Sequence, residues 1–391
     1  MPVPGSPQVR LPLVALLAAA CMAGLVHAPA QAAADVPADD NRALRRQLQE
    51  LTTAPGGPPG VIAVLKRESR TEVYRAGVAE VGTDRPIEVT DHMRIASTAK
   101  AYSGAVSLQL VDRGKLRLSD TIGKVLPRLP RAWHRVTLRQ LLNHTSGLPD
   151  YTADPEFLAL LAENPRRHFD SRRLLDFVAD EPLVFRPGSR YAYSNSDNIA
   201  VALMSEAATG RRYEELLTQL VYRPLDLHNT SLPRGYRIPE PYMHGYDVTP
   251  PDPPEDVSEA LSASGVWASG GIVSTPKDMT AFIRGYGGGR LISDRTRRQQ
   301  LNWVDGASEP AGPGRNKAGL ALFRYTTRCG VVYGHTGNFP GYTQLIASTP
   351  DGKRSLTVSL TTQVNKLNKP ELLERLRTVE ENFVCALLRN R

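Results

Sequence analysis

Apolar and polar residues alternate near both ends of the chain in a way that predicts β-strands there. Residues 61–66 and 71–79 are rich in β-branched side chains and flank a polar stretch, which is typical of a hairpin. Toward the C-terminus, four further runs have the same character, namely residues 319–325, 330–333, 342–348 and 355–362. Amphipathic patterns of helical period flank these strands, over residues 39–53 and 370–389.

The middle of the chain has a helical pattern instead. Candidate helices cover residues 101–113, 138–143, 171–179, 196–208 and 276–286. Because the strands occupy both ends, we predict an α/β fold, in which an antiparallel sheet is flanked by the terminal helices and an all-helical domain is inserted. The predicted sheet domain combines residues 35–100 with 260–391, the helical domain covers 101–259, and any active site is expected between them.

The first 34 residues have the pattern of a secretory signal peptide. They hold a single charge, Arg10, followed by the apolar run 11–26 and a stretch of small residues. The run is too short to span a membrane comfortably, and cleavage is expected after Ala32 or Ala34. A lipid anchor at Cys21 is the alternative. We therefore expect an exported protein of the cell envelope or medium, with no integral membrane segment after processing.

Composition places the 391-residue chain among globular proteins, since 41% of its residues are hydrophobic and 23% are charged. The 48 lysines and arginines exceed the 40 aspartates and glutamates, which gives a formal charge of +8, but basic and acidic residues are mixed along the chain. Without a basic stripe carrying interleaved aromatic residues, we expect no nucleic-acid partner. We expect the mature chain to be a monomer.

Two cysteines remain after the signal segment, Cys329 and Cys385. In an oxidising compartment such a pair favours a disulfide over a reactive thiol. Two separate buried thiols are the alternative, and only geometry decides between them.

The first candidate site is Ser97, which lies three residues before Lys100. On a helix the two side chains project from one face. A buried lysine loses its proton more easily, so it can accept the serine proton and make the hydroxyl a nucleophile. Small side chains over residues 101–105 permit burial of such a helix between two lobes.

The S-x-x-K spacing alone is weak evidence, and it recurs at Ser274 and Lys277. There Pro276 follows, so Ser274 or Thr275 is predicted to cap a helix that has proline in its first turn. We assign no chemistry to this second copy.

The second candidate site is Tyr193 with Asn195, in a polar segment before a predicted helix. A lysine ammonium nearby would lower the pKa of the tyrosine hydroxyl, which could then exchange protons with the serine and the leaving group. We interpret the adjoining Ser196 and Asp197 as the N-cap of that helix. A capped surface loop without catalytic function is the alternative for the whole segment.

The third candidate is the triplet His335-Thr336-Gly337, at the end of a predicted strand. A strand edge with glycine leaves backbone groups open to pair with an extended acyl-peptide, and a backbone N–H just beyond could stabilise an oxyanion. Alone the triplet indicates little, because residues 144–147 have a similar composition.

Taken together, S-x-x-K at Ser97, Y-x-N at Tyr193 and H-T-G at His335, with residues 141–149 between the first two, resemble the serine β-lactamase-like superfamily. The match is closest to secreted D-alanyl-D-alanine carboxypeptidases of the class C β-lactamase type, and it covers residues 38–388. The resemblance implies a sheet domain, a helical domain and an active site in the crevice between them.

The resemblance also implies roles for individual residues. The catalytic residues would be Ser97, Lys100, Tyr193, Asn195 and His335, and the substrate-binding residues would be Thr336, Gly337, Asn338 and Arg324. Ser97 would be acylated, while Lys100 and Tyr193 share proton transfer. The backbone N–H groups of Ser97 and Asn338 would form the oxyanion hole, and His335 stands where true β-lactamases commonly have lysine.

Three further expectations accompany the resemblance. Relatives pair a cysteine before the third motif with one near the C-terminus, which supports a bond between Cys329 and Cys385. No metal or organic cofactor is implied. Similar carboxypeptidases hold the substrate carboxylate with an arginine, but Arg324 is offset by one residue, and such an offset reverses the face of a strand unless a bulge restores it.

The first functional hypothesis is therefore a D-alanyl-D-alanine carboxypeptidase that acts on peptidoglycan stem peptides and is acylated by penicillins. The second keeps the scaffold but acts as an esterase, a D-amino-acid amidase or a β-lactamase. The third is a non-catalytic protein that binds peptidoglycan or β-lactams.

Overall fold

The computed structural model describes residues 41–389. The predicted signal peptide and the alternative lipid anchor at Cys21 lie outside this part of the chain. Within it, no helix combines the length and the apolar character that a membrane crossing requires.

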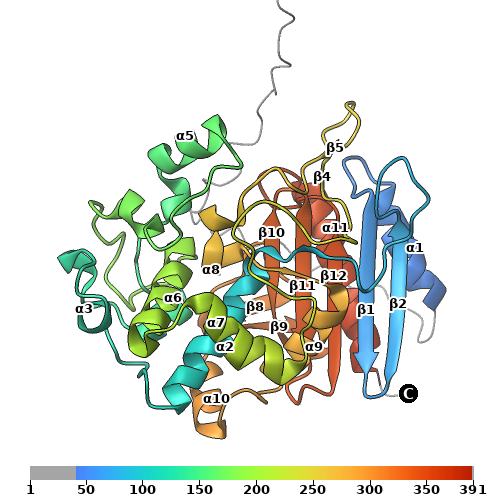
Figure 1. Cartoon of the computed structure of the whole chain (residues 1–391). Helices are drawn as coiled ribbons and strands as arrows, with labels where there is room; N and C mark the ends of the chain where they lie inside the picture. The colour runs from blue at the N-terminus through green and yellow to red at the C-terminus, as the bar shows by residue number, and fades with distance from the viewer. Residues whose placement is uncertain (1–40, 390–391) are drawn as a thin grey trace, which may run out of the picture.

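The architecture is an α/β fold built on one eight-stranded antiparallel sheet, as predicted (Figure 1). In spatial order its strands are β2 (Arg70–Gly77), β1 (Gly60–Arg67), β12 (Arg354–Leu360), β11 (Tyr342–Ser348), β10 (Gly330–Phe339), β9 (Phe323–Thr327), β8 (Arg315–Ala318) and β7 (Val304–Asp305). The N-terminal hairpin joins the C-terminal strands through β1 and β12, where Val61 lies opposite Leu360. The two ends of the chain therefore form one sheet.

Two strand boundaries differ from the prediction near the third motif. Residues 319–322 form a turn between β8 and β9, because Ala321 has a positive φ of 50° there and breaks the extended backbone. The strand predicted over 330–333 continues to Phe339, so that the H-T-G triplet lies within β10.

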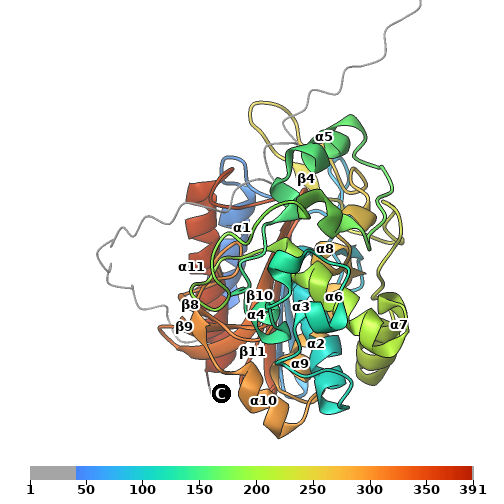
Figure 2. The same cartoon turned by 90° about the vertical axis from the view of Figure 1, so that its left-hand side faces the viewer.

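The helices α1 (Asn41–Thr52) and α11 (Pro370–Leu388) cover one face of the sheet (Figure 2). Apolar side chains from both helices meet the sheet in one cluster that includes Leu48, Phe383 and Val358. Cys329 and Cys385 form a disulfide, with their Cα atoms 5.1 Å apart. This bond ties the β9–β10 turn to α11 and confirms the predicted pairing.

The other face of the sheet contacts α9 (Pro276–Gly287) and a helical lobe. The remaining helices are α2 (Ala99–Asp112), α3 (Ile122–Val125), α4 (Leu138–Leu142), α5 (Pro155–Glu163), α6 (Asn195–Thr209), α7 (Tyr213–Leu217), α8 (Trp267–Gly270) and α10 (Asp294–Gln300). Helix α2 is buried along residues 99–110 and packs against α6 and α8, which agrees with its predicted position between lobes.

Two expectations for the middle of the chain are corrected. Residues 171–179 contain only a short 3-10 helix, Leu174–Val178. The lobe is also not entirely helical, because β4 (Tyr246–Asp247) pairs with β5 (Glu255–Asp256). β3 (Met93–Arg94), just before the first motif, pairs with β6 (Val273–Ser274). Short elements like these lack the repeated period that identifies longer ones.

Candidate active site

Ser97 lies in a 3-10 turn, Ala96–Thr98, that leads directly into α2. Ala96 adopts a left-handed φ of 50°, a conformation that residues other than glycine adopt rarely and that occurs often at functional sites. The turn rests on β10 at Gly337, where a Cβ atom would lie 2.6 Å from the Ile95 carbonyl oxygen and 3.2 Å from the Ser97 nitrogen. Glycine is therefore required at position 337 for Ser97 to approach the strand.

Lys100 lies one helical turn after Ser97 and is fully buried. Its Nζ donates to Ser97 Oγ at 3.0 Å, to Asn195 Oδ1 at 2.8 Å and to the Ser269 carbonyl oxygen at 2.7 Å. Burial lowers the pKa of this lysine to about 7, although nearby carboxylates, Asp150 first, oppose the shift. Near neutral pH, a large fraction of Lys100 is uncharged and able to accept the Ser97 proton.

Asn195 is the first residue of α6, and its amide is held in one orientation. Its Nδ2 donates to Asp150 Oδ2 at 3.0 Å and to Thr152 Oγ1 at 3.1 Å, which leaves Oδ1 for Lys100. The backbone N–H of Asn195 also donates to Asp150. The sequence analysis did not identify Asp150, Thr152 or Ser269, and the only available signal was the position of Asp150 directly after the 141–149 motif.

Tyr193 completes the cluster from the segment before α6, with only 7% of its surface exposed. Its hydroxyl is buried and has no hydrogen-bond partner within residues 41–389. Desolvation raises the pKa of this phenol well above 10, although the neighbouring Ser97 hydroxyl opposes the shift. The expectation of a lowered pKa is therefore wrong. Lys100 Nζ lies 5.0 Å from the centre of the Tyr193 ring, and burial outweighs any effect of its charge.

The residues after Tyr193 do not form the predicted N-cap. Ser194 occupies the cap position without a side-chain capping bond, and Ser196 and Asp197 are buried inside α6. Ser196 Oγ accepts a hydrogen bond from the Tyr151 backbone N–H at 3.0 Å. The prediction failed because it treated this segment as a solvated helix end, whereas the helical lobe covers it.

Asp197 belongs to a buried polar network behind Tyr193. Its carboxyl group lies 2.8 Å from His144 Nδ1 and accepts from Ser146 Oγ at 2.5 Å. The His144 ring lies against the Tyr193 ring, with the centroids 4.5 Å apart. Burial raises the pKa of Asp197 and lowers that of His144 to about 3, so the uncharged forms are favoured. The segment 144–147, which resembles the third motif in composition, thus supports the Tyr193 ring.

The third motif lies on a strand that is paired along only part of one edge. β10 pairs with β9 over residues 330–334, whereas its pairing with β11 covers 333–339. From His335 onward, β9 no longer occupies one edge of the strand, and the Ser97 turn packs beside Gly337 there. This arrangement agrees with the expected strand edge at the site.

His335 and Thr336 are both buried. His335 Nδ1 lies 2.6 Å from the Thr336 carbonyl oxygen, and Nε2 has no partner among the described residues. Burial lowers the pKa of His335 to about 3, so the imidazole is neutral and cannot replace a lysine charge. Thr336 Oγ1 donates to the Pro310 carbonyl oxygen at 2.6 Å, which directs its hydroxyl toward the 306–310 loop.

The two remaining predicted substrate residues lie differently. Asn338 donates its side-chain amide to Thr343 Oγ1 at 3.1 Å and to the Val364 carbonyl oxygen at 2.8 Å, so only its backbone is available for substrate. Arg324 lies opposite Tyr333 in β9, and its Nε atom is buried without a hydrogen-bond partner among the described residues. Its role in holding a substrate carboxylate stays a prediction.

The second S-x-x-K copy has the expected structural role. Thr275 caps α9 by accepting from the Asp278 backbone N–H, and Pro276 occupies the first turn. Ser274 is buried in β6, where its hydroxyl pairs with Thr230 Oγ1 at 2.8 Å.

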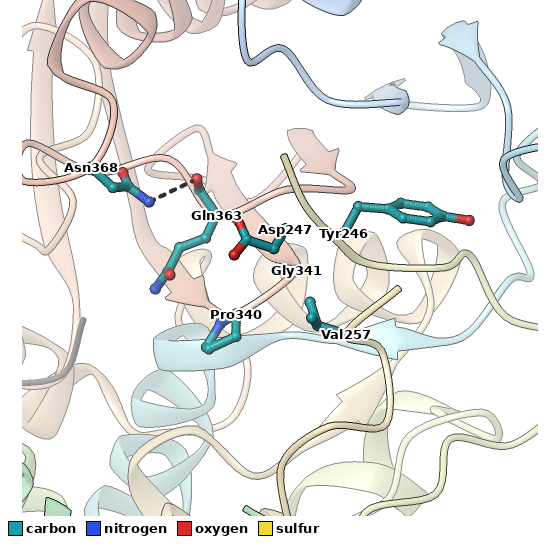
Figure 3. A pocket seen from close by; sticks show the side chains of 7 residues that line it. All are labelled: Tyr246, Asp247, Val257, Pro340, Gly341, Gln363 and Asn368. Carbon is teal, nitrogen blue, oxygen red and sulfur yellow. Dashed lines mark hydrogen bonds between the residues drawn. The ribbon is translucent and has the colours of Figure 1, made fainter. Parts of the chain in front are cut away.

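A separate open pocket of about 290 Å³ lies beyond the end of β10, at the turn into β11 (Figure 3). Its lining residues are Tyr246, Asp247, Val257, Pro340, Gly341, Gln363 and Asn368. None of them belongs to the Ser97 cluster. Across residues 41–389, no three His, Cys, Asp or Glu side chains are grouped to hold a metal ion.

Comparisons with known proteins agree with this geometry. The family model described as Beta-lactamase matches residues 44–380. Penicillin-binding protein 4* of Bacillus subtilis (strain 168) is 25% identical over 72% of this chain and 63% of its own length. A D-aminopeptidase of Brucella anthropi is 29% identical over 49% of this chain and 36% of its own length. The chain thus spans less than two thirds of these relatives.

Solved structures share the fold more completely. A D-stereospecific amidohydrolase from Streptomyces sp. is 28% identical, with a TM-score of 0.74 over 86% of this chain and 98% of that one. The D-amino acid amidase from Ochrobactrum anthropi SV3 in complex with L-phenylalanine amide has a TM-score of 0.76 over 88% of this chain and 98% of its own, and at 24% identity it supports the fold alone. With the family model matched over most of its length, the chain belongs to the beta-lactamase family.

Proposed function

We propose that this chain is an exported hydrolase that cleaves amide bonds next to D-amino acids through an acyl-Ser97 intermediate. One observation carries the proposal: Lys100 Nζ lies 3.0 Å from Ser97 Oγ, in a site where burial lowers its pKa to about 7. A lysine in this state is a base matched to neutral pH, and the serine is within its reach.

The acylation step follows from these contacts. Neutral Lys100 takes the Ser97 proton while Oγ forms a bond to the substrate carbonyl carbon. The carbon–nitrogen bond then breaks, Tyr193 gives its proton to the leaving nitrogen, and Lys100 returns a proton to the phenol. Because the raised pKa keeps Tyr193 protonated, it enters the reaction as an acid.

In deacylation, water replaces the serine as the nucleophile. A water molecule attacks the acyl carbon, the Ser97 oxygen leaves, and the proton of the water returns to the serine through the same base. The products are a carboxylic acid and free Ser97. A β-lactam would acylate the same serine, and similarity to a protein named for penicillin binding supports this.

The two candidate functions differ in the group that leaves the substrate. The carboxypeptidase hypothesis, in which peptidoglycan stem peptides lose D-alanine, requires a cation for the terminal carboxylate. The role of Arg324 as that cation stays a prediction. The second candidate is a D-aminopeptidase or D-amino-acid amidase, and similarity to a D-aminopeptidase and to a D-stereospecific amidohydrolase supports it. A silent binding protein would need no proton-transfer set.

Export is part of the proposal. The apolar run over 11–26 and the small residues that follow it support cleavage near Ala32 or Ala34. The disulfide between Cys329 and Cys385 supports an oxidising compartment.

The test is mass spectrometry of the intact protein after penicillin treatment, followed by peptide mapping. We expect one adduct, on the peptide that contains Ser97. Turnover is then compared for a D-alanyl-D-alanine peptide, a D-amino-acid amide, a chromogenic cephalosporin and a p-nitrophenyl ester. Hydrolysis of the ester alone would contradict the amide-hydrolase proposal.

A further inference from the structure

Glu309 lies in a loop that is fastened to the catalytic cluster at two points. On one side, Tyr191 donates its hydroxyl to the Ala307 carbonyl oxygen at 2.5 Å. On the other side, Thr336 donates to the Pro310 carbonyl oxygen at 2.6 Å. The loop therefore bridges the Tyr193 segment and the H-T-G strand, and Glu309 stands between the two attachment points.

Within this loop, the Glu309 side chain is free for other partners. Its neighbours Ser308 and Pro310 are buried, whereas Glu309 is exposed. Ser308 Oγ donates to the Pro310 carbonyl oxygen at 3.1 Å within the loop, and it lies 3.0 Å from Tyr325 Oη of β9. Among residues 41–389, Glu309 itself has neither a hydrogen bond nor an ion pair with another side chain.

The loop attachments place Glu309 beside the catalytic cluster, and its charge acts on the tyrosines there. It is the charged group with the largest effect on the pKa of both Tyr191 and Tyr193. The charges that act on Glu309 in turn are Asp150 and Lys100. No arginine is among them. Although exposed, the carboxyl group is surrounded by enough protein that desolvation raises its pKa to about 7.

The position relative to Tyr193 decides which half of a substrate Glu309 meets. In the mechanism proposed above, Tyr193 gives its proton to the leaving nitrogen, so the side of the site next to its hydroxyl receives the leaving group. The charge of Glu309 acts on that hydroxyl. In the chain Glu309 directly precedes Pro310, whose carbonyl oxygen accepts from Thr336. The oxyanion position at Asn338 lies two residues farther along β10. This side of the site thus presents the Glu309 carboxylate, which has no ion-pair partner among residues 41–389.

We propose that Glu309 selects the leaving group, disfavouring one that ends in a carboxylate and favouring one that carries an amide or, above all, a protonated amine. This inference rests on the proposed acyl-Ser97 function. The physical reason is that like charges repel and opposite charges attract more strongly where the surrounding protein reduces solvent screening.

The experiment uses the full mature chain and three donors that share the N-acetyl-D-alanyl group. Their leaving groups are D-alanine, D-alanine amide and 1,2-diaminoethane, which are anionic, neutral and cationic when bonded. At pH 8 we expect kcat/KM to increase in that order, by about tenfold or more between the first and the last, as one unit of pKa interaction implies. The changes to compare are Glu309→Gln and, as a matched control at the end of β7 just before the loop, Asp305→Asn.

Glu309→Gln should reduce the cationic-to-anionic ratio by about tenfold, while Asp305→Asn should leave it unchanged, because Asp305 is exposed and pairs with Lys317. A ratio that stays within twofold in Glu309→Gln, or a wild-type preference for the anionic donor, overturns the inference and leaves the hydrolase proposal intact. If no donor is cleaved, the proposed function itself is contradicted.

A second comparison distinguishes an effect of Glu309 on the leaving-group side from an effect on the acyl side of the substrate. D-alanine amide and its N-acetyl derivative differ only in the charge on the acyl side. We expect Glu309→Gln to affect both equally. A selective loss for the free amine would place Glu309 at the acyl group and overturn the assignment to the leaving group.

Discussion

The two faces of the central sheet differ in what they bury. Against α1 and α11, the strands bury mostly apolar side chains in one cluster that contains Leu48, Val358 and Phe383. Toward the helical lobe, burial includes Lys100, His335 and other groups that carry or exchange protons. The first face gains stability from removing apolar surface from water. The second face loses part of that stability, because it buries desolvated polar groups whose pKa values are shifted.

The largest effect we expect is from Ser97→Ala, on the polar face. Loss of the nucleophile should abolish penicillin labelling and reduce amide hydrolysis by a factor on the order of 10⁶. Intact-protein mass spectrometry and steady-state kinetics measure these outcomes. Ser274→Ala is the matched control, since Ser274 belongs to the other S-x-x-K copy. Penicillin should still label this variant protein. An adduct on the Ser97→Ala protein would refute the assignment.

The next effect in size is that of Tyr193→Phe. Because the buried phenol is the acid for the leaving nitrogen, we expect acylation by amide donors to slow by about 10²–10⁴. The rate of adduct formation under single-turnover conditions measures this. Tyr191→Phe, which loses a bond to the 306–310 loop instead, should have a much smaller effect. Equal losses in the two variants would assign Tyr193 a structural role only.

On the apolar face, Phe383→Ala should act on stability alone. The side chain is fully buried and lies edge-on to Tyr74, so we expect a loss of about 3–5 kcal/mol in the free energy of unfolding. Denaturant titration measures it, with Leu367→Ala as the control at a position that is 60% exposed. The acylation rate of folded protein should stay within twofold, and a larger change would show that the two faces are coupled.

The smallest effect is a dependence on pH. With a Lys100 pKa of about 7, the neutral fraction rises about tenfold between pH 6 and pH 8, and the acylation rate should rise with it. Pre-steady-state labelling across this range tests the relation. A rate that falls or stays flat would exclude Lys100 as the base.

The same burial sets the sign of a stability effect. The folded pKa of Lys100 lies below its ordinary value of 10.5, so between pH 7 and 10.5 the unfolded chain binds the additional proton. The contribution of Lys100 to the free energy of unfolding should therefore increase with pH in this window. Lys100→Met should lack this increase.

Much of the fold could be predicted from local patterns. The hairpin at 61–79 and the helices at both ends follow from period-two and period-3.6 alternation, which a short segment displays by itself. The prediction failed at 171–179 and 319–322, where apolar residues are buried by the rest of the fold and not by a regular element of their own. A local pattern does not distinguish these cases.

The site was predictable in its motifs and less so in its chemistry. Ser97, Lys100, Tyr193 and Asn195 are together in the structure, but Asp150, Ser269 and Glu309 were missed, since each belongs to a separate segment of the chain. The roles given to Thr336 and Arg324 stay predictions. The direction of the Tyr193 pKa was wrong because burial depends on surroundings that a motif does not contain.

By itself, the sequence determined the order of the motifs, the division into terminal strands and central helices, and the residue types available for acyl transfer. Only the tertiary structure decided which groups lie together, which of them lose their solvent, and which charges act on them. The reason is that periodicity and hydrogen-bonding capacity are properties of neighbouring residues. Desolvation and electrostatic interaction depend on atoms brought together from distant parts of the chain.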